Sequence, residues 1–224
     1  MDMECIAHRG FAGVNPENTL VAVEAALEAD ADAIELDVRR CADELVVVHD
    51  ETVDRVTDAS GPVSAFTAAE LAGLSVYGTD TGIPRLVDVC DAVSPDVRLN
   101  LEMKERDTAA EAVETAREHG CDLLVSSFLP GELAAIPDVP RAFLFEDDPE
   151  RGIERARDLG CRAVHPHWRL CTRSFLADAH GAGLAVNPWT IDSHEIATRL
   201  ADLGVDGLIA DAPAYCDADG PHGF

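Results

Sequence analysis

The 224-residue chain is short of positive charge, and of lysine above all, since Lys104 is its only lysine. Its 43 acidic residues outnumber 17 basic ones and give a formal net charge of −26. Such a chain repels nucleic acids and anionic membrane surfaces, so we set nucleic-acid binding aside. Because the acids are spread through ordinary apolar periodicity, we interpret them as a solvated, halophilic surface rather than as a disordered tail.

Paired cysteine motifs and long apolar runs are also missing. The seven cysteines form no C-x-x-C pair, and no apolar run approaches the roughly 18 residues of a membrane span. No signal peptide is recognisable at the start of the chain. We therefore expect reduced thiols, no zinc site built from them, no stable membrane insertion and a cytoplasmic location.

A third absence concerns the fold. No G-x-G-x-x-G motif follows any predicted strand, which argues against a doubly wound, dinucleotide-binding sheet. Short apolar runs predict strands at residues 5–7, 33–38, 97–101, 123–126, 142–145, 163–165, 184–187 and 207–210. Amphipathic stretches between them predict helices at residues 20–28, 86–92, 109–119, 149–159, 172–180 and 195–203. This regular α/β alternation predicts one domain over residues 1–224, a parallel sheet closed as a (β/α)8 TIM barrel.

One segment interrupts the alternation, between the second predicted strand and its helix. It covers about residues 39–84 and contains an apolar run at 45–48, the pair His49-Asp50 and a short predicted helix within 66–74. We interpret it as a small insertion at the barrel mouth, where long loops often carry function.

Polar residues gather at the predicted carboxyl ends of the strands, which form the active face of such a barrel. Glu35 and Asp37 lie two residues apart and therefore share a strand face, and Glu102 and Lys104 have the same spacing. Buried carboxylates are costly unless positive charge lies between them. Three carboxylates suit Mg²⁺ or Ca²⁺ better than zinc, so Glu35, Asp37 and Glu102 are candidate ligands of one divalent cation.

A simpler interpretation of these residues stays open in so acidic a chain. Glu35 and Asp37 would also suit a solvated strand end paired with Arg39 or Arg40, and Lys104 would suit an ordinary surface position.

Three histidines stand at predicted strand ends. His8 and His49 each precede a charged residue, and two histidines on either side of a scissile bond supply a general acid and a general base near neutral pH. Arg9, beside His8, would hold a phosphate ester. His165 ends the sixth strand and would line the site as a second tier.

Together these motifs resemble the glycerophosphodiester phosphodiesterase family, in the right order and over nearly the whole chain. The matching segments are His8-Arg9-Gly10, Glu17-Asn18-Thr19, Glu35-Leu36-Asp37, His49-Asp50, Pro84-Arg85-Leu86, Glu102-Met103-Lys104, Ser127-Phe128, Trp189-Thr190 and Gly204-Val205-Asp206-Gly207.

The resemblance implies a barrel, with a small insertion after its second strand, that hydrolyses glycerophosphodiesters to glycerol 3-phosphate and an alcohol. It implies His8 and His49 as the catalytic acid–base pair and Lys104 as the catalytic residue that stabilises developing charge. It further implies Arg9 as the phosphate-binding residue and Glu35, Asp37 and Glu102 as metal ligands. We also expect Trp189, His165 and Ser127 to line the substrate site.

Other functions remain open at this point. Lys104 would suit a Schiff-base aldolase or a sugar-phosphate isomerase, although the nearby acids would keep its amine protonated. A non-catalytic barrel that binds phosphate esters or a metal, and a lyase that stops at a cyclic phosphate, are the remaining alternatives. The sequence does not specify the alcohol, the metal, the histidine that acts as acid, the nucleophile (water or a substrate hydroxyl) or the oligomeric state.

Overall fold

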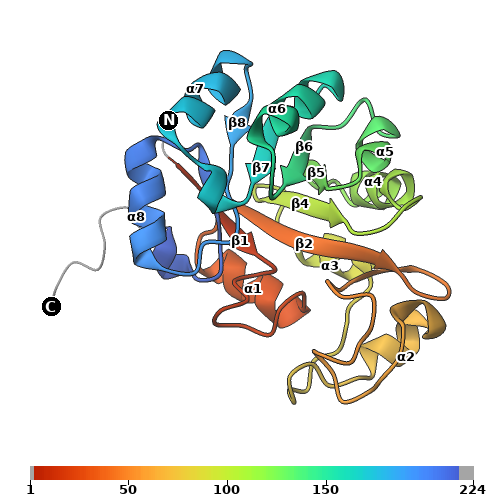
Figure 1. Cartoon of the computed structure of the whole chain (residues 1–224). Helices are drawn as coiled ribbons and strands as arrows, with labels where there is room; N and C mark the ends of the chain where they lie inside the picture. The colour runs from red at the N-terminus through yellow and green to blue at the C-terminus, as the bar shows by residue number, and fades with distance from the viewer. Residues whose placement is uncertain (1–2, 217–224) are drawn as a thin grey trace, which may run out of the picture.

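The computed structural model describes residues 3–216, so both ends of the predicted 1–224 domain lie outside the described residues. Eight parallel strands form the centre of the molecule (Figure 1). They are β1 (Glu4–His8), β2 (Ala33–Arg40), β4 (Arg98–Met103), β5 (Leu123–Ser127), β6 (Arg141–Phe145), β7 (Ala163–Pro166), β8 (Ala185–Val186) and β9 (Gly207–Ala210). Their order in space is β8-β7-β6-β5-β4-β2-β1-β9.

The two ends of this sheet meet and close the barrel. The amide of Asp206 donates to the carbonyl of Val186 at 3.0 Å. The amide of Ile191, in the segment after β8, donates to the carbonyl of Ile209 at 2.9 Å. The closure is nearly complete, and the predicted (β/α)8 fold is confirmed.

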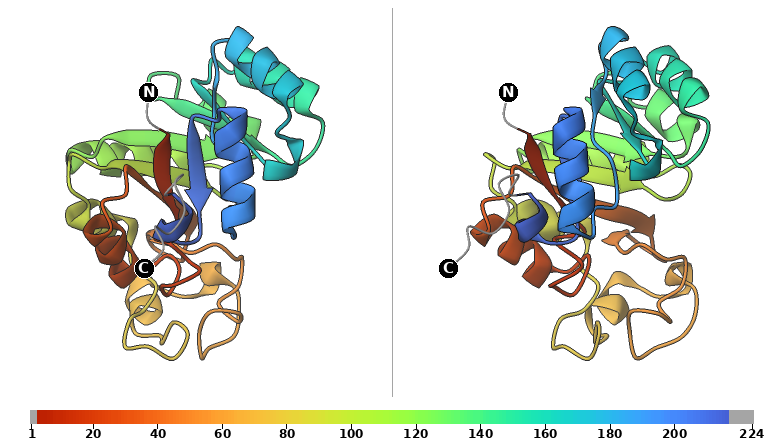
Figure 2. Two further views of the ribbon diagram at one scale, coloured as in Figure 1. Left: turned by 90° about the vertical axis from the view of Figure 1, so that its left-hand side faces the viewer. Right: turned by 60° about the vertical axis from the view of Figure 1, so that its left-hand side comes forward.

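Helices surround the strands (Figure 2). They are α1 (Leu20–Glu28), α3 (Leu86–Ala92), α4 (Ala109–Glu118), α5 (Pro130–Ala134), α6 (Pro149–Asp158), α7 (Arg173–Gly181) and α8 (His194–Leu203), with one-turn 3₁₀ helices η2 (Trp168–Leu170) and η3 (Pro213–Tyr215). Local chemistry sets several ends: the Thr19 hydroxyl caps α1 by accepting from the amide of Ala22, and Gly204 ends α8 in the left-handed conformation.

The main hydrophobic core lies between the outer faces of the strands and the helices. Outward residues such as Leu36 and Leu99 are completely buried there. The alternate residues point into the barrel, and the strand register brings them to common levels: His8 lies opposite Glu35, Glu35 opposite Asn100, and Asp37 opposite Glu102. This parity delivers polar side chains to the barrel axis.

The insertion begins with β3 (Leu45–Val47), which pairs antiparallel with the end of β2. It continues through η1 (Val63–Ala65) and α2 (Ala68–Ala72) before the chain returns to α3. A separate hydrophobic cluster that includes Val53, Leu71 and Val76 holds it together. In Figure 1 the insertion, coloured orange to gold, extends from the barrel below β2.

The expectation of seven reduced cysteines is wrong for one pair. Cys5 on β1 and Cys216 after η3 form a disulfide, with 5.3 Å between their Cα atoms. The two are 211 residues apart in sequence, and they meet because β1 and β9 are neighbours in the barrel. The other five cysteines are free thiols.

Within residues 3–216, no helix combines the length and the apolar character that a membrane crossing requires.

Candidate active site

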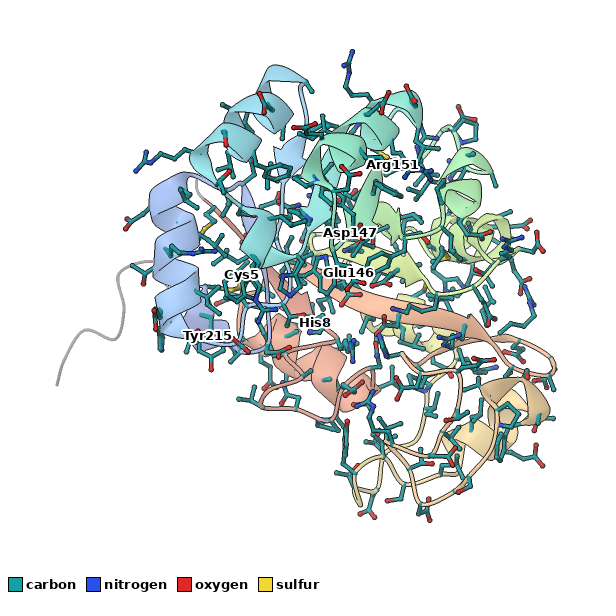
Figure 3. All side chains as sticks on the ribbon, in the orientation of Figure 1. Cys5, His8, Glu146, Asp147, Arg151 and Tyr215 are labelled. Carbon is teal, nitrogen blue, oxygen red and sulfur yellow. A yellow bond between two sulfur atoms is a disulfide. The ribbon has the colours of Figure 1, made fainter. Side chains whose placement is uncertain are left out.

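A cavity of about 250 Å³ opens at the carboxyl ends of the strands. It brings together most of the residues singled out in the sequence. Its lining consists of His8, Arg9, Glu35, His49, Glu102, Lys104, Ser126, Phe128, Leu144, Glu146, His165, Trp189, Thr190 and Ile209. His8 and Glu146 are labelled near the centre of Figure 3.

Three buried carboxylates form a cluster, and two of them, Glu35 and Glu102, line this cavity. Glu35, Asp37 and Glu102 each offer an oxygen, and these oxygens lie within 4.8 Å of one another. The Oε1 atom of Glu35 is buried and has no hydrogen-bond partner among residues 3–216. A hard cation with oxygen ligands would satisfy it, so the donor set fits Mg²⁺ or Ca²⁺.

The charges of this cluster are unequal. Burial raises the pKa of Glu35 well above its usual value, and the nearby Asp37 carboxylate adds to the shift. Burial and Asp37 likewise raise the pKa of Glu102 to about 7. Burial also disfavours the charged form of Asp37, but the cations of Arg9 and Lys104 outweigh it and hold its pKa at about 2. Without a bound cation, protons in this cluster therefore bind to Glu35 and Glu102 rather than to Asp37.

Arg9 is locked in place by acids on three sides. Its Nε lies 3.0 Å from Oδ2 of Asp37, and its NH1 group donates to Oε1 of Glu17 at 2.9 Å. Its backbone amide donates to Oε2 of Glu35 at 3.1 Å. The guanidinium is thus held at the cavity wall before any substrate arrives.

Lys104 lies against the same carboxylates. Its Nζ donates to Oε1 of Glu102 at 2.6 Å and lies 3.4 Å from Oδ1 of Asp37. Burial alone would lower its pKa, but these two acids raise it above the ordinary value. The amine is therefore protonated, which disfavours Schiff-base chemistry and suits an electrostatic role.

The two candidate catalytic histidines share one arrangement. Nδ1 of His8 lies 2.6 Å from Oδ1 of Asp211, and Nδ1 of His49 lies 2.6 Å from Oδ1 of Asp50. Each ring is thus oriented by a carboxylate and keeps Nε2 for other contacts. Burial, together with the positive charges of Arg9 and Lys104, lowers the pKa of His49 and favours its neutral form.

The apolar wall of the cavity is formed by Phe128, His165 and Trp189. Burial lowers the pKa of His165 to about 3, so this ring is uncharged, and its backbone carbonyl accepts from Nε1 of Trp189 at 2.8 Å. The Trp189 ring packs edge-on against Phe128, with 5.6 Å between ring centroids.

Ser127 does not line the cavity, so its expected substrate contact does not fit its position. Its hydroxyl donates to the carbonyl of Met103 at 2.7 Å and accepts from the amide of Leu129. Strand parity explains the difference, since Ser126 pairs with Glu102 and points inward while Ser127 points outward.

Sequence reasoning assigned no role to several residues that complete the site, although Asn18 and Phe128 lie in matching segments. Asn18 donates from its side-chain amide to Asp37 and accepts from the Asp37 backbone, which fixes that carboxylate. Phe128 and Glu146 also line the cavity. Neither residue type indicates a particular chemistry from its position in the sequence alone.

A sequence model described as the glycerophosphoryl diester phosphodiesterase family matches residues 8–215. The chain belongs to this family of phosphodiester-cleaving enzymes. The match spans every site residue described above.

Relatives in this family match the chain over almost its full length. A glycerophosphodiester phosphodiesterase of Bacillus altitudinis is 32% identical over 92% of this chain and 94% of its own. One of Caldanaerobacter subterraneus is 32% identical over 93% of both chains. Among solved structures, an Oleispira antarctica phosphodiesterase in complex with its product sn-glycerol-3-phosphate has a TM-score of 0.89 at 29% identity, covering 96% of this chain and 95% of that one.

Proposed function

We propose that this chain hydrolyses glycerophosphodiesters to glycerol phosphate and an alcohol in the cavity at the barrel mouth. In this proposal Glu35, Asp37 and Glu102 hold one divalent cation, Mg²⁺ or Ca²⁺, and His8 and His49 act as the acid–base pair. The observation that carries it is the meeting, in one cavity, of two carboxylate-oriented histidines with a buried carboxylate cluster. The relatives' activity supports the substrate class.

Binding of the phosphate requires local positive charge, because a phosphodiester is an anion and the whole chain carries a formal charge of −26. Arg9 and Lys104 line the cavity and are protonated, and both are already fixed by acids. A bound divalent cation would add charge there and polarise the phosphoryl oxygens. As negative charge accumulates on those oxygens, Arg9 and Lys104 stabilise it without having to reorganise.

Hydrolysis breaks the bond between phosphorus and the alcohol oxygen and forms one between phosphorus and the attacking oxygen. One imidazole accepts the proton of the attacking oxygen, and the other donates a proton to the departing alcohol. Asp211 and Asp50 hold the Nδ1 side of each ring, so that both Nε2 atoms serve the reaction. The attacking oxygen belongs to water or to the substrate's neighbouring hydroxyl. Attack by the hydroxyl would release the alcohol and leave a cyclic phosphate, which a water molecule must then open to give glycerol phosphate.

The apolar wall serves the uncharged part of the substrate. Trp189 and Phe128 offer ring edges and faces to the carbon chain of a glycerol group, and the neutral His165 closes the interior behind them.

The test is release of glycerol 3-phosphate from glycerophosphocholine and glycerophosphoethanolamine in high salt. We expect release with added Mg²⁺ or Ca²⁺ and its loss with EDTA. Borohydride with a carbonyl substrate should give no adduct at Lys104. Absence of release from any glycerophosphodiester with every metal tried would contradict the proposal.

A further inference from the structure

We propose that Arg55, in the insertion, is a positioning residue that holds His49 and Arg9 together in their working arrangement. The inference rests on the proposed function, because it assigns Arg55 a part in that reaction. Arg55 does not line the cavity, so it would act through the residues it contacts rather than on the substrate.

The first connection runs to His49 through Asp50. One oxygen of the Asp50 carboxylate, Oδ1, lies 2.6 Å from Nδ1 of His49. The other, Oδ2, accepts a hydrogen bond from Nε of Arg55. Asp50 is thus fixed from two sides, and the orientation that it gives to the imidazole depends on Arg55.

The second connection runs to Arg9 through Glu17. The NH1 and NH2 groups of Arg55 donate to the two carboxylate oxygens of Glu17, each at 2.8 Å. Oε1 of Glu17 also accepts from NH1 of Arg9 at 2.9 Å. Burial disfavours the charged form of Glu17, but the two guanidinium groups reverse this and lower its pKa to about 2. Glu17 is therefore an anion shared between Arg55 and Arg9.

Tyr77, also in the insertion, reinforces the second connection. Its hydroxyl accepts from NH1 of Arg55 at 2.7 Å and donates to Oε2 of Glu17 at 2.7 Å. The contacts link the insertion to the loop that precedes α1, since Arg55 and Glu17 are 38 positions apart in sequence. Through this junction, the insertion that carries His49 is held in register with the loop that carries Arg9.

The geometry requires a guanidinium. Arg55 uses Nε for Asp50, NH1 for both Glu17 and Tyr77, and NH2 for Glu17, so its donors point in three directions within one plane. A lysine ammonium has three donors on a single flexible point charge and cannot reproduce this planar fork. Arg55→Lys therefore keeps the positive charge but cannot form all four of these hydrogen bonds at once.

The chain offers a matched control in Arg85. It follows the insertion directly, at the N-cap of α3, and its side chain is 41% exposed against 45% for Arg55. It is paired with Asp88 and Glu44. It lies outside the cavity lining and contacts none of His49, Asp50, Glu17 or Arg9 among the bonds of residues 3–216. Arg85→Lys thus tests the general effect of replacing an ion-paired arginine in or beside the insertion.

The experiment measures kcat and KM for glycerophosphocholine hydrolysis with saturating metal, together with the unfolding temperature. For Arg55→Lys we expect kcat to fall ~10-fold and KM to rise ~3-fold, while Arg85→Lys changes each by less than about 2-fold. Variants in the two connections should affect different kinetic constants. Asp50→Asn should lower mainly kcat, and Glu17→Gln should raise mainly KM. Adding Arg55→Lys to Asp50→Asn should lower kcat by less than the product of the single effects, because both act on His49.

Two results would overturn the inference. One is an Arg55→Lys enzyme with wild-type kcat and KM. The other is an equal loss of activity in Arg55→Lys and Arg85→Lys that follows a shared loss of stability. If Arg55→Lys does not fold, Tyr77→Phe takes its place; it should raise KM at an unchanged unfolding temperature, and a KM equal to that of wild type would contradict the role. A wild-type enzyme that releases no product contradicts the proposed function instead, so the two failures are distinguishable.

Discussion

Neighbouring charges decide which residues of the site are ionised. Asp37 stays ionised because Arg9 and Lys104 contact it, whereas burial and Asp37 itself raise the pKa values of Glu35 and Glu102. Three carboxylates with two cationic side chains leave an excess of negative charge when all are ionised. A divalent cation reverses this excess, so the cluster is built to gain from binding one.

Removing a carboxylate of the cluster should therefore weaken metal binding before it affects the chemistry. For Glu35→Ala and Glu102→Ala we expect the metal concentration for half-maximal activity to rise by at least ~10- to 100-fold, the loss typical of residues that only support a ligand, with activity partly restored by excess metal. Titration of activity with Mg²⁺ and with Ca²⁺ measures this, and Asp147→Asn, an exposed acid outside the cavity lining, is the control. Variants that no metal concentration rescues would argue against ligand roles.

The buried His165 ring predicts a loss of folding stability as the pH falls. Its folded-state pKa of about 3 lies below the value near 6.5 expected in the unfolded chain. The unfolded state therefore binds a proton first, so stability is complete above about pH 6.5 and is lost as the pH falls from there towards 3. At pH 5 the loss is ~2 kcal/mol from this ring alone.

His165→Gln should lose less stability than wild type between pH 7.5 and pH 5. Urea unfolding at both pH values in the same salt measures the difference, and His194→Gln, at an exposed position, should behave like wild type. An identical acid loss in the His165→Gln and wild-type proteins would show that the buried ring is not the cause.

The junction of β1 and α1 places the first site residues. Gly10 follows Arg9 and has a φ of 75°, and a Cβ there would lie 2.6 Å from Cβ of Ala22 and 2.7 Å from its carbonyl carbon. The strand end and the helix therefore approach too closely for any side chain. The close approach brings the loop of Arg9 and Glu17 onto the barrel.

A comparison of Gly10→Ala with Gly120→Ala distinguishes the cost of the clash with Ala22 from the cost of the left-handed backbone conformation. Gly120 has nearly the same φ, 73°, but a Cβ there would meet nothing within 4 Å. We expect Gly120→Ala to cost ~1–2 kcal/mol for its left-handed conformation alone. Gly10→Ala should cost ~2 kcal/mol more, with a clear loss of activity, because Ala22 cannot move away. Equal unfolding free energies for the two variants would contradict the packing argument.

Apolar periodicity predicts most elements of this fold because each buried strand and each amphipathic helix has its own local pattern. It does not predict α5, whose five residues begin with Pro130 and Gly131 and are too short to show a period. Motif order along the chain indicates the cavity residues, since the carboxyl ends of parallel strands converge.

Contacts between residues that are distant in sequence are harder to predict from the sequence. The choice between Ser126 and Ser127 requires the strand register, and the pairing of Cys5 with Cys216 requires knowing that β1 and β9 are neighbours. The contacts of Arg55, on which its proposed role rests, are hidden for the same reason, because Glu17 is distant from it in sequence.

At the scale of the whole molecule, the formal charge of −26 opposes the compact state. Salt screens this repulsion, since the Debye length falls from ~30 Å at 0.01 M to ~3 Å at 1 M. We expect the unfolding temperature to rise steeply with salt and the protein to unfold or aggregate when salt is removed. Thermal scans across this range check the expectation, and a salt-independent unfolding temperature would overturn the halophilic interpretation.

The central claim is that His8 and His49 together carry out metal-dependent hydrolysis, and one comparison tests it most directly. Glycerol 3-phosphate release from glycerophosphocholine, at saturating metal, is measured for wild type, His8→Ala, His49→Ala and His119→Ala. His119 is the matched control, because its Nδ1 also lies 2.6 Å from a carboxylate, that of Asp91, but outside the cavity lining. We predict a loss of ~10³-fold or more in the first two variants, with fold and metal binding intact, and unchanged turnover in the third. Substantial turnover in His8→Ala or His49→Ala would contradict the account.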